Sequence, residues 1–183
     1  MAGAGRRLVT GAIDLRAYIR DVPDFPQPGI LFRDVTPLLK DPAAFEVALS
    51  GLQAYVASRS PTAIVGIESR GFLFGTPIAA RLGLPFVPVR KPGKLPAAHM
   101  SIEYALEYGE GQLDIHTDAL APGDRAVIID DLLATGGTAL GTAKLVEMLG
   151  ARVVGLAFLI ELQALGGRRE LTGYDVHSLI AYQ

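Results

Sequence analysis

Two adjacent acids and a glycine-rich turn follow one apolar run in the second half of the chain. Asp130 and Asp131 come directly after Ala-Val-Ile-Ile at 126–129. Ionised carboxylates accept hydrogen bonds, and the vicinal hydroxyls of a ribose offer two donors at a matching distance. The sequence Ala-Thr-Gly-Gly-Thr at 134–138 adds backbone that can approach a ligand closely, at the start of a predicted helix. These residues predict a site that holds a sugar hydroxyl pair and a phosphate together, rather than an ordinary helix start beside two solvated acids.

A second strand-turn-helix segment has the same order of features. An apolar run ending at Ile67 is followed by Glu68-Ser69-Arg70, then by Gly71 and a helical pattern. An arginine in such a turn has the planar fork that binds a phosphate through two hydrogen bonds. By itself this turn is better explained as a capped helix with a surface arginine. A second anion-binding turn in the same sheet favours the phosphate interpretation.

Three cations, Arg90, Lys91 and Lys94, follow the next predicted strand. A solvated basic loop is the usual explanation of such a run. Here the loop is expected at the same sheet edge as both anion-binding turns, because the carboxyl ends of parallel strands meet there. Together the three elements predict a ligand that carries phosphates at two ends.

Acids and aromatics alternate from Glu103 to Gly109. Two segments of alternating polarity, around 101–108 and 112–116, predict a hairpin, and a mobile flap carrying a carboxylate there would close over the site and exclude water. The alternative is an edge hairpin with polar outward positions, and the pattern alone leaves both open.

The motifs exclude several common sites. Neither GxxxxGK[ST] nor GxGxxG occurs in the glycine-rich loop, so it is not a Walker-type or dinucleotide-binding loop. The histidines at positions 99, 116 and 177 lack the spacing of metal ligands, and Ser69 has no histidine-based activation. We therefore expect no protein-bound metal and no hydrolase triad.

Strands and helices must alternate to position these turns. We expect strands at 62–67, 85–90, 125–130, 152–160 and 176–182, and helices at 15–22, 42–58, 72–82 and from Thr138 to Gly150. The alternation predicts an α/β fold with a mostly parallel central sheet flanked by helices.

Length and composition are those of one globular domain. The chain has 183 residues, of which 50% are hydrophobic, and a net charge of −2, which argues against nucleic-acid and membrane surfaces. The absence of cysteine excludes disulfides and thiol catalysis and fits a reducing cytoplasm. Residues 1–22 contain no uninterrupted apolar region, so we expect no secretory signal, and no apolar stretch approaches the ~20 residues that a membrane span needs. We expect a cytoplasmic protein.

Segments along nearly the whole chain together resemble the type I phosphoribosyltransferases, and among them those that act on adenine. The segments that carry the resemblance are, in order, Asp24-Phe25-Pro26, Gly29, Phe32-Arg33-Asp34, Glu68-Ser69-Arg70-Gly71-Phe72, Arg90-Lys91-Pro92-Gly93-Lys94-Leu95-Pro96, Leu106-Glu107-Tyr108-Gly109 and Val127 to Thr138.

The resemblance implies an activity and an organisation. The activity is Mg²⁺-dependent transfer of the phosphoribosyl group from phosphoribosyl pyrophosphate (PRPP) to adenine, which gives AMP and pyrophosphate. The organisation is a single domain over 1–183, with an N-terminal hood at 1–40, a flexible loop and hairpin at 91–116, and assembly into a homodimer. The alternatives are a catalytically inactive PRPP-binding regulator and a transferase for another base.

The resemblance also implies a role for each segment. The ribose and 5′-phosphate of PRPP would be bound by Asp130, Asp131, Ala134, Thr135, Gly136, Gly137 and Thr138. The pyrophosphate would be bound by Glu68, Ser69, Arg70, Arg90, Lys91 and Lys94, with a cis peptide between Glu68 and Ser69. Adenine would be bound by Leu31, Phe32, Arg33 and Leu132. Arg70 and Glu107 would be the catalytic residues, with Glu107 near the purine N7 and Tyr108 beside it in the flap.

One position discriminates between bases within this family. Members that act on hypoxanthine or guanine carry an Asp, which handles N7, where this chain has Ala134. An apolar residue there implies adenine, with the proton-handling group supplied from elsewhere.

Overall fold

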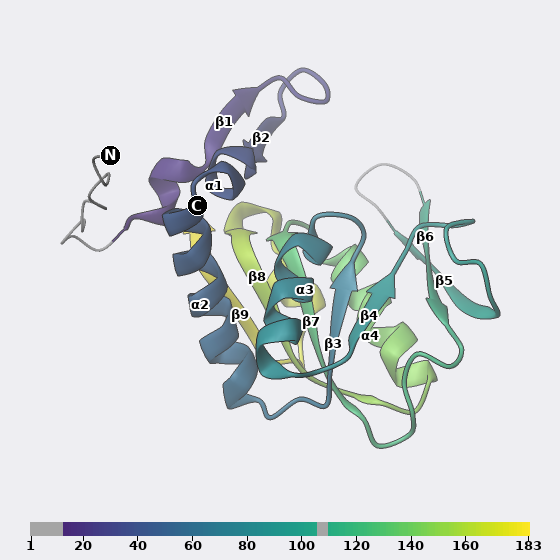
Figure 1. Cartoon of the computed structure of the whole chain (residues 1–183). Coiled ribbons are helices and arrows are strands. Elements are labelled where there is room, and N and C mark those ends of the chain that lie inside the picture. The colour runs from purple at the N-terminus through teal and green to yellow at the C-terminus, as the bar shows by residue number, and fades with distance from the viewer. Residues whose placement is uncertain (1–12, 106–109) are drawn as a thin grey trace, which may run out of the picture. The chain divides into compact units, whose positions relative to one another are not determined.

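The computed structural model describes residues 13–105 and 110–183 of the chain (Figure 1). The chain divides into two compact units, and the division lies between Val47 and Ala48. In the described residues no helix is long and apolar enough to cross a membrane. The expected division into one domain with a hood over 1–40 and a flexible segment over 91–116 stays a prediction.

The first unit contains a small antiparallel strand pair. Its elements are the 3₁₀-helix η1 (Leu15–Tyr18), the strands β1 (Arg20–Pro23) and β2 (Leu31–Asp34), the helix α1 (Thr36–Lys40) and the start of α2 (Pro42–Ser58). The helix expected at 15–22 is wrong in its second half, because Arg20 to Pro23 pair with β2 instead. Phe25 packs edge-on against Phe32, with ring centroids 5.1 Å apart. The start of α2 is as expected, since the Asp41 carboxylate accepts the backbone N–H groups of Ala43 and Ala44.

The second unit is built on a parallel five-stranded sheet, in the order β4-β3-β7-β8-β9. Its strands are β3 (Ala63–Ile67), β4 (Phe86–Val89), β7 (Arg125–Leu133), β8 (Arg152–Leu162) and β9 (Val176–Tyr182). The sheet is flanked by the helices α3 (Gly71–Leu82) and α4 (Gly137–Met148) (Figure 1). The chain runs from β8 through η2 (Gln163–Leu165) and α5 (Gly167–Glu170) into β9. Every residue of β3 is buried, as in a sheet covered on both faces. The predicted α/β class is confirmed.

Strand β7 is longer than the sequence pattern indicates. The pattern ends the strand at Asp130, but the ladder runs on from the pair of Asp130 with Phe158 to the pair of Leu133 with Glu161. The neighbouring β8 extends to Leu162 and supplies backbone partners beyond the apolar run. Asp130 and Asp131 are therefore held by a strand backbone, which fixes the direction of their side chains.

The strands β5 (His99–Ala105) and β6 (Glu110–His116) form the expected hairpin. Leu113 and Ile115 of β6 are buried in the same core as residues of α4. Arg90 forms an antiparallel bridge with Asp114, which joins the end of β4 to the hairpin. The hairpin is therefore packed into the core, and the bridge to Arg90 places it beside the carboxyl end of β4.

Candidate active site

The carboxyl ends of β3 and β7 form one cleft. Two adjoining cavities of about 330 Å³ and 250 Å³ share Glu68, Arg70, Lys91, Asp130 and Asp131 among their linings. Ser69 lines the smaller cavity. The larger cavity continues to Leu132, Ala134, Thr135, Gly136 and Thr138. The structure therefore brings together the two anion-binding turns and part of the basic loop, as expected from a parallel sheet.

The two acids are adjacent, and Asp131 is buried and paired with Arg70. Asp131 is 3% exposed, and its backbone N–H donates to Oδ1 of Asp130 at 2.9 Å. Nε of Arg70 lies 2.6 Å from Oδ2 of Asp131. Burial raises the pKa of Asp130, and the neighbouring Asp131 carboxylate raises it further. Burial also raises the pKa of Asp131, although the Arg70 guanidinium opposes that rise.

A glycine lets α3 begin directly beside these acids. A Cβ atom on Gly71 would lie 2.6 Å from the Ile129 carbonyl oxygen and 3.0 Å from Oδ1 of Asp130. Such distances exclude a side chain unless the backbone moves. Gly71 therefore permits the close approach that places Arg70 against Asp131. The peptide between Glu68 and Ser69 is cis, as the family resemblance implied.

Glu68 orders the basic loop. Its carboxylate accepts hydrogen bonds from Nε and Nη2 of Arg90, each at 3.2 Å, and from the backbone N–H of Lys91 at 2.8 Å. Burial alone would raise the pKa of Glu68, but the Lys91 N–H and the Arg90 guanidinium outweigh it and lower the pKa. Nη1 of Arg90 donates to the Lys94 carbonyl oxygen at 3.2 Å. Neither Arg90 nor Lys94 lines the two cavities, whereas Lys91 lines both.

The family resemblance implies PRPP as the ligand of this cleft, and we then expect Arg90→Gln to weaken its binding indirectly, by releasing the loop. The variant loses a two-point contact to Glu68, and a charge-assisted hydrogen bond is worth roughly 1.5–3 kcal/mol, less where solvent screens it. The KM for PRPP should rise about tenfold with a smaller change in kcat. Steady-state kinetics beside Arg152→Gln, a change at the exposed start of β8, would measure this. An unchanged KM would contradict the anchoring role.

The loop after β7 leads into the N-terminus of α4, and residues 134–138 make up the predicted phosphate-binding segment, here called the cradle. Gly136 is the N-cap of α4 and has φ of 91°, a left-handed conformation that favours glycine. The free N–H groups and the positive end of a helix of this length favour an anion. With the acids of β7 a few residues away, this cradle matches the predicted combination of ribose and phosphate contacts.

Some predicted site residues lie elsewhere in the chain. Leu31, Phe32 and Arg33 are in β2 of the first unit, where Arg33 forms an ion pair with Asp21. Glu107 and Tyr108 lie outside the described residues. Their assignment to adenine and to the flap stays a prediction.

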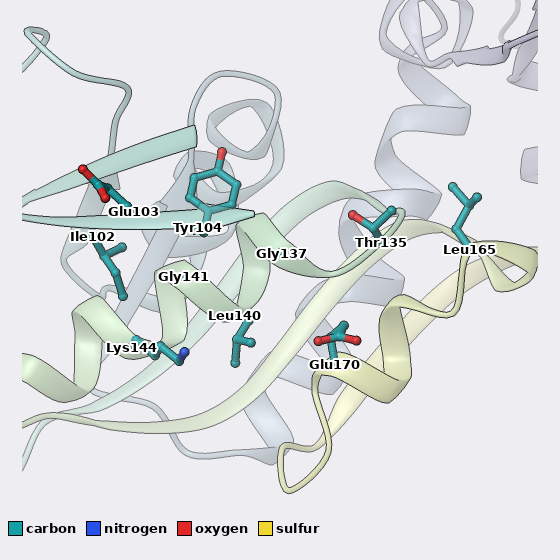
Figure 2. Close-up of a pocket in the computed structure, with 10 residues that line it drawn as sticks. All are labelled: Ile102, Glu103, Tyr104, Thr135, Gly137, Leu140, Gly141, Lys144, Leu165 and Glu170. Atoms are coloured by element: carbon teal, nitrogen blue, oxygen red, sulfur yellow. The ribbon is translucent and has the colours of Figure 1, made fainter. Parts of the chain in front are cut away.

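Tyr104 is a lining residue that the sequence did not single out. It lies near the end of β5 and lines both the larger cavity of the cleft and a neighbouring cavity of about 520 Å³ (Figure 2). A Cβ atom on Gly141 of α4 would contact the Tyr104 side chain at an ordinary 3.5 Å. Alternating polarity in the hairpin gave the only signal for this residue. Its position depends on packing against α4.

Comparison with known proteins gives the family of this chain. The Phosphoribosyl transferase domain family matches residues 38–180. The adenine phosphoribosyltransferase of Carboxydothermus hydrogenoformans is 58% identical over 170 residues, covering 93% of this chain and 100% of the relative. The crystal structure of adenine phosphoribosyltransferase from Thermoanaerobacter pseudethanolicus has a TM-score of 0.90 at 54% identity, covering 92% of this chain and 98% of that one.

A third similar protein was solved with ligands. The adenine phosphoribosyltransferase of Saccharomyces cerevisiae, complexed with D-2,5-dideoxy-2,5-imino-altritol 1,6-bisphosphate and adenine, has a TM-score of 0.86 at 38% identity. The match covers 90% of this chain and 96% of that one. The family match includes the parallel sheet up to Ile180 of β9 and the residues that line the cleft. The chain belongs to the phosphoribosyl transferase domain family and, within it, to the adenine phosphoribosyltransferases.

Proposed function

We propose that this enzyme transfers the 5-phosphoribosyl group of PRPP to adenine and releases AMP and pyrophosphate, a purine salvage reaction. The observation that carries the proposal is the single cleft that joins a ribose-binding pair of acids, a phosphate cradle and a cationic turn. PRPP needs these features together, because it carries a monophosphate and a diphosphate on one ribose.

The proposed roles follow from the chemistry of each group. Asp130 and Asp131 accept hydrogen bonds from the ribose hydroxyls. Residues 134–138 bind the 5′-phosphate at the start of α4. Arg70 and Lys91, with the Glu68–Ser69 turn, face the pyrophosphate, and the loop ordered by Arg90 and carrying Lys94 adds positive charge nearby. Leu132 lines the larger cavity, and the family resemblance assigns adenine to it and to the β2 residues Leu31, Phe32 and Arg33.

The reaction exchanges one bond at the anomeric carbon for another. N9 of adenine bonds to C1 of the ribose as the bond from C1 to the pyrophosphate oxygen breaks, and the electron pair of that bond leaves with pyrophosphate. Positive charge develops on the ribose and negative charge on the leaving group, so preorganised cations stabilise the transition state. The purine also loses the proton of its imidazole ring, and the base that takes it is expected near N7.

Mg²⁺ enters this scheme as part of the substrate. Hard phosphate oxygens are the ligands that Mg²⁺ prefers, and it commonly binds through substrate phosphates with few protein carboxylates. The ion neutralises charge on the diphosphate, while Arg70 and Lys91 bind the same end of the donor. We therefore propose a Mg²⁺ requirement without a dedicated protein cage.

Glu107 is our proposed acid–base group, on the strength of the family resemblance. General acid–base catalysis is typically worth about 10²–10⁴-fold. We expect Glu107→Gln to lower kcat by roughly this factor and to leave the Kd of PRPP nearly unchanged. Single-turnover kinetics and PRPP titration of the same variant would separate the two quantities. A kcat equal to that of the wild type would remove Glu107 from the mechanism.

The proposed activity is tested by supplying PRPP and Mg²⁺ with one base at a time. AMP is expected from adenine, and no nucleotide is expected from hypoxanthine or guanine, because Ala134 has no carboxylate for N7. PRPP binding without turnover of any base would identify a regulator instead. Efficient turnover of hypoxanthine would reject the specificity assigned to Ala134.

We further propose a homodimer. Support comes from the family resemblance, which places the turn before α3 near an interface, and from Leu73 of α3, which is 43% exposed. Light scattering should then give about twice the chain mass of 19.4 kDa. A monomeric mass in the active enzyme would contradict this.

The proposed partners are the small molecules adenine, PRPP, AMP and pyrophosphate. The net charge of −2 supports these rather than nucleic acid as partners. PRPP and AMP are highly charged and cross membranes poorly, which supports a cytoplasmic site for the reaction.

A further inference from the structure

A short segment after β8 lies directly against the back of the 134–138 loop. A Cβ atom on Gly167 would stand 2.2 Å from the Ala134 carbonyl oxygen and 2.9 Å from the Gly136 nitrogen. In the opposite direction, a Cβ atom on Gly136 would lie 2.6 Å from the Gly167 carbonyl oxygen. These neighbours are backbone atoms, so a side chain at either position must displace main chain. The two backbones touch because both residues are glycine.

Arg168, the next residue, ties this segment to the central sheet. Its Nε and Nη2 donate to the two carboxylate oxygens of Glu161 at 3.0 Å and 2.5 Å, and its Nη1 donates to the Val176 carbonyl oxygen at 2.7 Å. Glu161 is 4% exposed on β8, and Val176 is the first residue of β9. A bidentate arginine contact fixes orientation as well as distance. Gly167 is thereby held relative to two strands.

The ion pair of Arg168 with Glu161 is maintained at neutral pH. Hydrogen bonds from Arg168 lower the pKa of Glu161, and they outweigh the opposing effect of its burial. The carboxylate of Glu161 is therefore ionised when the enzyme works, and both charges of the pair are present.

Figure 2 shows the two sides of this contact. Thr135 and Gly137 belong to the loop and the start of α4, whereas Leu165 and Glu170 belong to the segment after β8. The Cβ atom of Glu170 is one of the atoms that a side chain on Gly136 would meet, at 3.0 Å. The contact thus continues along α5.

We infer that Glu161, Gly167 and Arg168 form a support that positions the 5′-phosphate loop. Arg168 and Glu161 hold the segment on the sheet, and Gly167 sets how closely it approaches the loop backbone. They are positioning residues, because none of them lines the cleft in which the ligand is proposed to bind. The inference rests on the proposed function, which assigns the 5′-phosphate to this loop.

Gly167→Ala tests the support. The added Cβ must push the Ala134 carbonyl away, and a displacement of about 1 Å at a binding loop can cost up to about 10²-fold. We expect the Kd of AMP and the KM for PRPP to rise at least about tenfold, while the Kd of magnesium pyrophosphate, which needs no 5′-phosphate contact, changes less than about twofold. Calorimetric titration of the folded variant with AMP and with pyrophosphate measures both.

The adjacent glycine provides the control. Gly166 has φ of 70° and a Cβ atom there would meet only the Arg169 side chain, at 3.9 Å. Asparagine tolerates this left-handed conformation. Gly166→Asn should therefore bind AMP and pyrophosphate as the wild type does.

A second pair of variants keeps the inference testable if Gly167→Ala does not fold. Arg168→Gln removes the clamp, and Arg169→Gln changes the same charge at the next residue, an exposed one. Arg168→Gln should weaken the binding of AMP more than the binding of pyrophosphate. Arg169→Gln should leave the binding of both ligands unchanged. The support role would be overturned if Gly167→Ala or Arg168→Gln weakened the binding of AMP and of pyrophosphate equally. It would also be overturned if either variant left the binding of both unchanged. A wild type that makes no AMP from PRPP and adenine would instead reject the proposed function.

Discussion

Asp130→Asn is expected to weaken PRPP binding and to make the folded protein more stable at neutral pH. The variant loses a charged acceptor for a ribose hydroxyl, and hydrogen bonds to charged groups are worth roughly 1.5–3 kcal/mol, so kcat/KM should fall about 10–100-fold. Stability should change in the opposite direction. Burial and the adjacent Asp131 raise the pKa of Asp130, which means that folding disfavours its charged form.

The sign of the pH dependence follows from that raised pKa. Stability linked to Asp130 is fully present below the pKa of the unfolded chain and is lost as the pH rises through the higher pKa of the folded state. At neutral pH, well above the pKa of the unfolded chain, the placement of Asp130 therefore costs stability, and Asp130→Asn should melt at a higher temperature than the wild type. The difference should shrink as the solution is acidified. Calorimetry at several pH values would record it.

Binding should show the matching dependence. As the pH falls, Asp130 takes up a proton earlier than an ordinary aspartate, so the KM for PRPP of the wild type should rise relative to that of Asp130→Asn. This comparison cancels the titration of the PRPP phosphates themselves. Asp118→Asn, the same change at an exposed position, is the control. A lower melting temperature with an unchanged KM for PRPP would contradict the role assigned to Asp130.

Arg70→Gln is expected to lower both the rate of catalysis and the stability of the protein. Arg70 lies 2.6 Å from Asp131 and lines both cavities of the cleft, so the variant loses a cation facing the pyrophosphate and the partner of a buried carboxylate. Loss of one preorganised donor typically lowers kcat by about 10²–10³-fold. The unpaired Asp131 should also lower the free energy of unfolding by roughly 1–3 kcal/mol, nearer the low end because the Arg70 side chain is 40% exposed.

Two further variants separate the charge of Arg70 from its geometry. Arg70→Lys keeps the charge but not the planar fork, so it should restore most of the stability and only part of the activity. Arg152→Gln, at the exposed start of β8, should leave both at the wild-type level. Full activity in Arg70→Gln would exclude Arg70 from pyrophosphate binding. An unchanged unfolding free energy would show that the pair with Asp131 contributes nothing.

Much of the cleft is predictable because its signals are local. An apolar strand, a polar turn and a helix start are each encoded within about ten residues, and parallel strands direct their following turns to one edge. Asp130, Asp131, Arg70 and Lys91 can therefore be assigned to one site from the order of residues alone. The helix expected at 15–22 is wrong because a partner strand beginning at Leu31 decides the conformation of residues 20–23.

The fold class, the sheet edge that carries the cleft and the residue types that line it are all predictable from the order of the residues. How those residues are held depends on contacts of the tertiary structure: Arg70 on Asp131, Arg90 on Glu68, and Gly167 against the 134–138 loop. Each of these contacts joins residues from separate segments of the chain, so no periodicity or spacing in the sequence predicts it. Gly167 is the clearest case, because a glycine after a strand usually marks a turn. Its significance appears only when a distant backbone lies where its side chain would be.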